Sequence, residues 1–93
     1  MWLVKIMTRK YIKKPIPVEA VQWTGDNRKD IWDFCSLSYF NYNIETDKLE
    51  LFIQTLEGPM SANVGDYIIK GVKGEFYPCK EDIFNETYDQ ITE

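Results

Sequence analysis

Apolar and polar side chains alternate along residues 48–56, KLELFIQTL. One set comprises Leu49, Leu51, Ile53 and Thr55, and the other comprises Lys48, Glu50, Phe52 and Gln54. A period of two residues places the two sets on opposite faces of a β-strand and does not fit a helix. Residues 39–46 are rich in β-forming side chains, and Thr46 and Asp47 supply a turn. The pattern therefore predicts two antiparallel strands joined as a hairpin.

Further short runs bounded by turn residues predict four more strands. They cover residues 18–23, 60–64, 67–70 and 75–79. Pro15 and Pro17 precede the first of them, and proline has no backbone N–H to donate. We therefore expect this strand at the edge of a sheet.

Two segments have the three- and four-residue spacing of apolar side chains that is typical of helices. In residues 28–36 the apolar side chains are Ile31, Phe34 and Cys35, and Asp26 or Asn27 is the expected cap. In residues 80–91 they are Ile83, Phe84, Thr87, Tyr88 and Ile91. The predicted fold class is α+β, with a small, mainly antiparallel sheet of about five to six strands and two short helices.

The length of 93 residues supports one domain. We predict a single α+β domain over residues 9–93 and an N-terminal extension or edge strand over residues 1–8. The apolar run before Lys5 is too short for a signal peptide or a membrane span, and Met7 is an alternative start residue. Cys35 and Cys79 match no metal or redox spacing. We expect both to be buried thiols in a reducing compartment, the cytoplasm.

The formal net charge of −4 argues against direct binding of nucleic acid, which requires clustered cations. The charges are segregated: residues 1–14 contain only basic charged side chains, and residues 81–93 contain only acidic ones. Two interpretations follow. The ends pair within one molecule, or they pair head to tail between the subunits of a homo-oligomer.

The segment GVKGEFY does not fit a phosphate-binding loop, because no Lys-Ser or Lys-Thr pair leads into a helix. Gly71 and Gly74 are instead expected to supply positive φ angles in a hairpin, and Asp66 to cap the turn at Gly65. Glu81 and Asp82 already occupy the positive end of the last helix, which makes it a poor anion site.

Lysine residues lie on or beside this hairpin, next to aromatic residues, and together they suggest a candidate ligand site. The predicted ligand-binding residues are Trp23, Tyr67, Lys70, Lys73, Tyr77 and Lys80. Aromatic stacking together with cationic contacts suits a small anionic ligand. The alternative is that the aromatic rings pack internally and that the lysines are solvated.

Catalysis has little support in the sequence. The chain has no histidine, and neither cysteine has an activating partner close in sequence. Carboxylate pairs such as Glu19 with Asp26 are common by chance in an acidic chain. We therefore expect no enzyme activity, no catalytic residue, no metal and no cofactor.

Three segments carry a resemblance to a known group of proteins: YIKKPIPVEAVQWTGDN, LFIQTLEGPMSANVGDYIIKGVKGEFYPCK and DIFNETY. Together they resemble a widespread family of small bacteriophage and prophage proteins, over residues 9–90 and most specifically from Gly65 to Tyr88. The family is mostly uncharacterised, so the resemblance implies phage origin and no catalytic residues. Glu81 departs from the family pattern, in which proline precedes the final helix.

Phage origin and the residue pattern lead to three hypotheses. The first is a non-enzymatic accessory protein that counters host immunity by sequestering a small anionic nucleotide signal in the bacterial cytoplasm. The second is an inhibitor of a host defence protein that binds through an acidic surface at Asp82, Glu86 and Asp89. The third is a minor structural or assembly protein. Three tryptophans, Trp2, Trp23 and Trp32, belong either to the core or to an oligomer interface.

Overall fold

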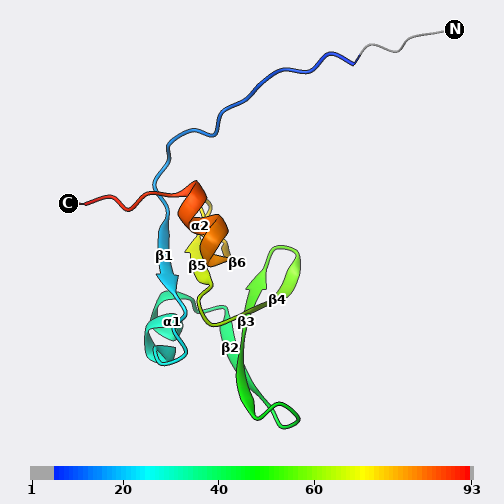
Figure 1. Ribbon diagram of the computed structural model, residues 1–93, viewed down its shortest axis with the longest axis vertical. Helices are drawn as coiled ribbons and strands as arrows, with labels where there is room; N and C mark the ends of the chain where they lie inside the picture. Colours follow the sequence, from blue (N-terminus) through cyan, green and yellow to red (C-terminus); the bar gives the residue numbers. More distant parts are fainter. Residues whose placement is uncertain (1–5, 93) are drawn as a thin grey trace, which may run out of the picture.

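The computed structural model of this chain describes residues 6–92, which form six strands and two helices (Figure 1). In chain order they are β1 (Glu19–Gln22), α1 (Arg28–Phe34), β2 (Ser38–Asn43), β3 (Lys48–Thr55), β4 (Gly58–Ala62), β5 (Tyr67–Lys70), β6 (Phe76–Cys79) and α2 (Glu81–Thr87). All pairings are antiparallel, which confirms the predicted α+β class. The strands divide between two three-stranded sheets, in the orders β1-β5-β6 and β2-β3-β4.

The alternating run forms β3, the central strand of the second sheet. Leu51 and Ile53 are fully buried, as their shared parity predicts, and Leu51 is paired with Phe40 on β2 and with Ala62 on β4. The hairpin turn begins earlier than expected. The Asn43 side-chain oxygen accepts the backbone N–H groups of Glu45 and Thr46, so β2 ends at Asn43 rather than at residue 46.

The first sheet has β5 at its centre and β1 at one edge, as the prolines before β1 predict. Its pairing places Ile69 beside Ala20 and Tyr77, and Lys70 beside Glu19 and Phe76. Since partners in register share a face, Ile69 and Tyr77 lie on one face, and Lys70 and Phe76 on the other.

The core lies between the two sheets and α1. Its buried cluster contains Trp23, Ile31, Cys35, Leu51, Ile53, Ala62, Ile68 and Phe76. Two aromatic contacts connect these elements. The ring centroids of Trp23, which follows β1, and Phe40 on β2 are 5.3 Å apart. Those of Phe34 on α1 and Phe76 on β6 are 5.6 Å apart, edge to face. The predicted inward positions of α1 are therefore confirmed.

Asn27 occupies the N-cap position of α1, but its side chain does not cap the helix. The Asn27 side-chain oxygen accepts a hydrogen bond from the Thr24 backbone N–H at 2.9 Å. The Asn27 side-chain NH₂ group donates to the Gln22 backbone carbonyl at 2.7 Å. Asn27 thus closes the loop between β1 and α1.

The second helix is shorter than predicted. It ends at Thr87, and Tyr88 has extended backbone angles. The predicted apolar stripe is wrong, because Ile83, Thr87 and Ile91 are exposed and only Phe84 and Tyr88 are partly buried. Phe84 stacks on Tyr67 with ring centroids 3.9 Å apart, and this contact lays α2 against the first sheet (Figure 1). The face that contains Ile69 is therefore covered by α2, whereas Ile68 belongs to the main core.

Of the two glycines predicted to have positive φ angles, Gly74 has one and Gly71 does not. Gly74 has φ of 80° and Gly65 has φ of 101°, which L side chains rarely adopt. Gly71 does not have a positive φ, so its predicted role is wrong; its N–H instead donates to the Glu75 carbonyl at 2.7 Å and closes the hairpin. The Asp66 prediction is confirmed, because its carboxylate accepts the Asn63 N–H at 2.9 Å.

Residues 6–17, which we call the arm, contain no helix or strand, and every residue in them is exposed. Figure 1 shows the arm running away from the sheets. The radius of gyration is 17.4 Å, compared with about 12 Å for a compact chain of this length. The predicted edge strand over residues 1–8 is absent at residues 6–8, and residues 1–5 lie outside the described part.

Among residues 6–92, the basic and acidic ends do not form the expected ion pairs within one molecule. Over residues 6–92 the one ion pair within 4.0 Å joins Lys29 and Asp33. Lys13 instead donates a hydrogen bond to the Tyr88 phenol oxygen at 3.1 Å. No helix in this range has the length and hydropathy needed to cross a membrane.

Candidate functional site

A groove of about 610 Å³ lies between α1 and β2, and we call it the aromatic groove. Its lining comprises Arg28, Lys29, Trp32, Asp33, Tyr39 and Phe40. Sites for small organic ligands typically have volumes of roughly 300–1,000 Å³ and combine aromatic walls with a few polar groups. The groove has this size and this composition.

Helix α1 supplies one wall of the aromatic groove, because one side of the helix is buried and the other is exposed. Ile31 faces the core, while Arg28 and Trp32, four residues apart, share the outer side. Trp32 is 66% exposed, which is unusual for so large an apolar side chain. The helix therefore presents an indole ring and a guanidinium group together at the groove.

Strand β2 supplies the facing wall. Tyr39 is 45% exposed, and its ring stacks on that of Phe52 across the strand pair, with centroids 5.3 Å apart and an angle of 13° between the ring planes. This stacking restricts the tyrosine side chain. Phe40 is half buried and reaches the core through Trp23. The aromatic wall is thus held by packing on both sides of the strand.

The charges in the groove are unequally available. The Lys29 ammonium lies 2.7 Å from the Asp33 carboxylate, and this hydrogen bond raises the pKa of Lys29 above its usual value. The Arg28 guanidinium carbon lies 6.0 Å from the centre of the Phe40 ring and has no carboxylate within ion-pair distance among residues 6–92. Arg28 is therefore the cation that the groove offers to an anionic ligand.

The structure does not bring the six predicted ligand residues together. The prediction that Trp23 binds a ligand is wrong, because only 2% of its surface is exposed and it packs in the core. Tyr67 is stacked beneath Phe84. Lys70 lies on the opposite face of the sheet from Tyr77, and Lys73 lies in the hairpin loop between them. Alternation along β5 and β6 separates side chains that are close in sequence.

Tyr77 lies in a smaller groove of about 190 Å³, which Lys13, Lys14 and Glu75 also line. Burial, together with a hydrogen bond to Tyr88, raises the pKa of Tyr77 to about 12. The Lys13 hydrogen bond lowers the pKa of Tyr88. Lys13, Lys14 and Ile16 of the arm line this groove, so it is where the base of the arm contacts the first sheet.

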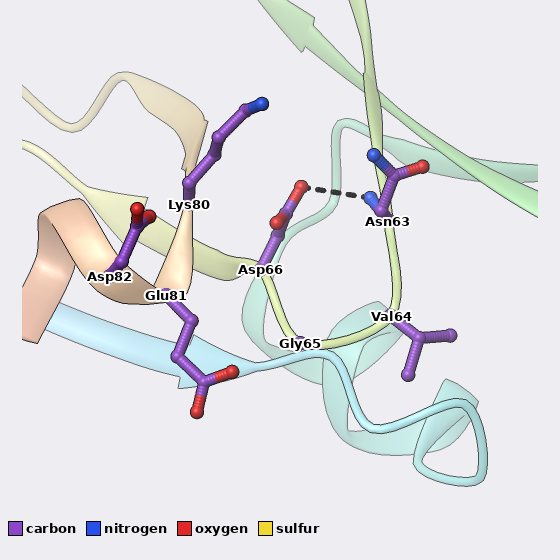
Figure 2. Close-up of a pocket in the computed structure, with 7 residues that line it drawn as sticks. All are labelled: Asn63, Val64, Gly65, Asp66, Lys80, Glu81 and Asp82. Atoms are coloured by element: carbon purple, nitrogen blue, oxygen red, sulfur yellow. Dashed lines mark hydrogen bonds between the residues drawn. The ribbon is translucent and has the colours of Figure 1, made fainter.

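Lys80 lies beside a third hollow, of about 330 Å³, at the turn before β5 (Figure 2). Figure 2 shows Asp66 bonded to Asn63 and the side chains of Lys80 and Glu81 directed apart. Asp82 completes an excess of carboxylates around the hollow. Such a site is electrostatically unfavourable for an anionic ligand. Within residues 6–92 no group of three His, Cys, Asp or Glu side chains has the arrangement needed to hold a metal ion.

The acidic residues of the alternative site are exposed. Phe84 faces the sheet, so a helical period places Asp82 and Glu86 on the outer side of α2. Asp89 lies beyond the end of the helix and is exposed as well. These residues form an acidic surface, but Asp89 is not part of the helix face.

Both cysteines are free thiols. Cys35 is fully buried in the main core, and burial raises its pKa. Cys79 is only half buried, so the prediction of a buried thiol is confirmed for Cys35 and is too strong for Cys79. Burial raises the pKa of Cys79 too. A raised pKa disfavours the reactive thiolate form.

The aromatic groove was missed by the sequence interpretation, although one signal for it exists. Trp32 does not belong to the apolar stripe of Ile31, Phe34 and Cys35, so the helical period places a tryptophan on the solvent side of α1. Tyr39 had no comparable signal, because tyrosine is common on strands. No protein-family model, curated protein or solved structure matches this chain.

Proposed function

We propose that this protein binds a small anionic nucleotide in the aromatic groove without changing it chemically. In the phage setting that the sequence resemblance implies, such binding sequesters a nucleotide signal of host immunity in the bacterial cytoplasm. The observation that carries the proposal is the exposed Trp32 ring beside the Arg28 guanidinium, which has no carboxylate within ion-pair distance among residues 6–92.

A nucleotide has two parts that match these two groups. A base offers a flat aromatic face, and stacking of a base on an aromatic side chain contributes roughly 1–3 kcal/mol. A phosphate accepts two parallel hydrogen bonds from a guanidinium group. Tyr39 offers a second ring on the facing wall, already aligned by Phe52. The groove thus supports recognition of a base and of a phosphate at one place.

The same groove offers little for catalysis. Its one lining carboxylate, Asp33, is held by the Lys29 ammonium at 2.7 Å, and the chain contains no histidine. A bound nucleotide is therefore expected to be recovered with unchanged mass after incubation with the protein.

The proposal is tested by calorimetric titration with a panel of mononucleotides, dinucleotides and cyclic dinucleotides. Trp32→Ala and Arg28→Ala are each expected to weaken the best ligand of the panel roughly tenfold or more, because each removes one of the two recognition groups. Trp32→Phe keeps an aromatic face and is expected to retain most of the affinity.

Lys70→Ala and Lys73→Ala serve as matched controls. They remove cations that the sequence suggests as ligand contacts but that do not line the aromatic groove, so affinity is expected to stay unchanged. The proposal fails if no nucleotide of the panel binds. It fails equally if binding survives Trp32→Ala combined with Arg28→Ala, or if the two lysine variants abolish it.

A further inference from the structure

We propose that the arm of one chain docks on the outer face of α2 of a second copy. The result is a homodimer in which each chain contributes an arm and accepts one. This inference is independent of nucleotide binding, because the aromatic groove lies at α1 and β2 and contains neither partner of the contact. Three observations support it: the composition of the arm, the character of α2, and the way the arm leaves its own chain.

The arm exposes a mixture of apolar and cationic side chains that is unusual for a free segment. Tyr11 is 88% exposed and Ile12 is 92% exposed. The cationic residues are Arg9, Lys10, Lys13 and Lys14, and no acidic residue interrupts them. Exposed apolar side chains gain stability by burial against another surface. A complementary partner must therefore be acidic and must offer apolar area.

The outer face of α2 meets both requirements. Asp82 and Glu86 lie one turn apart on it, and among residues 6–92 neither has a cation within ion-pair distance. Ile83 lies beside them and is 52% exposed. The face thus combines two unpaired carboxylates with an apolar side chain, and its charge is opposite to that of the arm.

Among residues 6–92, the arm forms no ion pair with Asp82 or Glu86 of its own chain. Its base is held by Lys13, which bonds to Tyr88 and lies 5.1 Å from the centre of that ring. Beyond this point the arm turns away from the body (Figure 1). Arg9 and Lys10 are both exposed and are therefore accessible to a second chain. Exchange of arms between two copies forms the same contact twice, as expected for two-fold symmetry.

Reversing the charges on the arm and on the outer face of α2 tests the contact. Sedimentation analysis is expected to find a dimer for the natural chain. Arg9→Glu with Lys10→Glu is expected to raise the dissociation constant roughly tenfold or more, and so is Asp82→Lys with Glu86→Lys, because like charges then face each other. Mixing the two variants is expected to restore the dimer, since each arm then meets a helix of opposite charge.

Lys48→Glu with Lys73→Glu provides the control: it changes the net charge by the same amount as the arm variant, at exposed sites outside the contact. It is expected to leave the dimer intact. All the substituted positions are exposed, and circular dichroism checks that each variant is folded.

The proposal would be overturned by a monomeric natural chain at high concentration, by a dimer that withstands both reversals, or by variants that dissociate but do not recover on mixing. A basic host protein that holds the monomer through Asp82 and Glu86 would also overturn it and would favour the inhibitor hypothesis.

Discussion

Replacing Trp23 by alanine is expected to lower the free energy of unfolding by about 3–5 kcal/mol, because the substitution empties a large part of the core. Trp23 is only 2% exposed and contacts the Phe40 ring at a centroid distance of 5.3 Å. Natural domains have total stabilities of about 5–15 kcal/mol, so this loss is a large share of the whole. Urea unfolding followed by far-ultraviolet circular dichroism measures it.

Trp32→Ala is the matched control, because the same side chain is removed from a surface site that is 66% exposed. Its effect on the free energy of unfolding is expected to stay within about 0.5 kcal/mol. The two tryptophans are thus expected to separate two properties: Trp23→Ala lowers stability, and Trp32→Ala lowers the affinity for the proposed nucleotide ligand. Equal losses of stability in the two variants would contradict the assignment of Trp23 to the core and Trp32 to the groove.

Leu51→Ala is expected to destabilise the protein by about 2–5 kcal/mol, the range seen when a buried leucine is truncated and the surroundings collapse incompletely. Leu51 has no exposed surface and lies at the centre of the second sheet, between Phe40 and Ala62. The midpoint of urea unfolding is expected to fall while the slope of the transition is retained.

Leu56→Ala provides the comparison for this variant. Leu56 follows the end of β3 and is 83% exposed, so the same truncation removes little buried area. Its midpoint is expected to match that of the natural protein. A midpoint for Leu51→Ala that is as high as that of Leu56→Ala would mean that the face of β3 is assigned incorrectly.

The sequence predicted the elements of the fold better than their arrangement. The alternation in residues 48–55 identified β3 and the face that carries Leu51 and Ile53. It could not show that the strands divide between two sheets, because β1 pairs with β5, far along the chain. Local periodicity reports which side chains share a face and says nothing of which distant strand supplies the hydrogen bonds.

The candidate site was harder to predict for a related reason. Lys70 and Tyr77 lie close together in the hairpin sequence, but the register of β5 with β6 places them on opposite faces of the sheet. Conversely, Trp32 and Tyr39 are on different elements, and the packing of α1 beside β2 brings them to one groove. A cluster in sequence becomes a cluster in space only where register and packing allow it.

The position of β5 constrains the order in which a growing chain can fold. β1 is made early, but its strand partner is β5, which is made only after the whole second sheet. The face of β5 that contains Ile69 is covered only after α2, the last element, has been made. The β2-β3-β4 sheet has all its strand pairs between neighbours in the chain and can form while synthesis continues. The two sheets are therefore completed at different times, and the one that contains β1 is completed last.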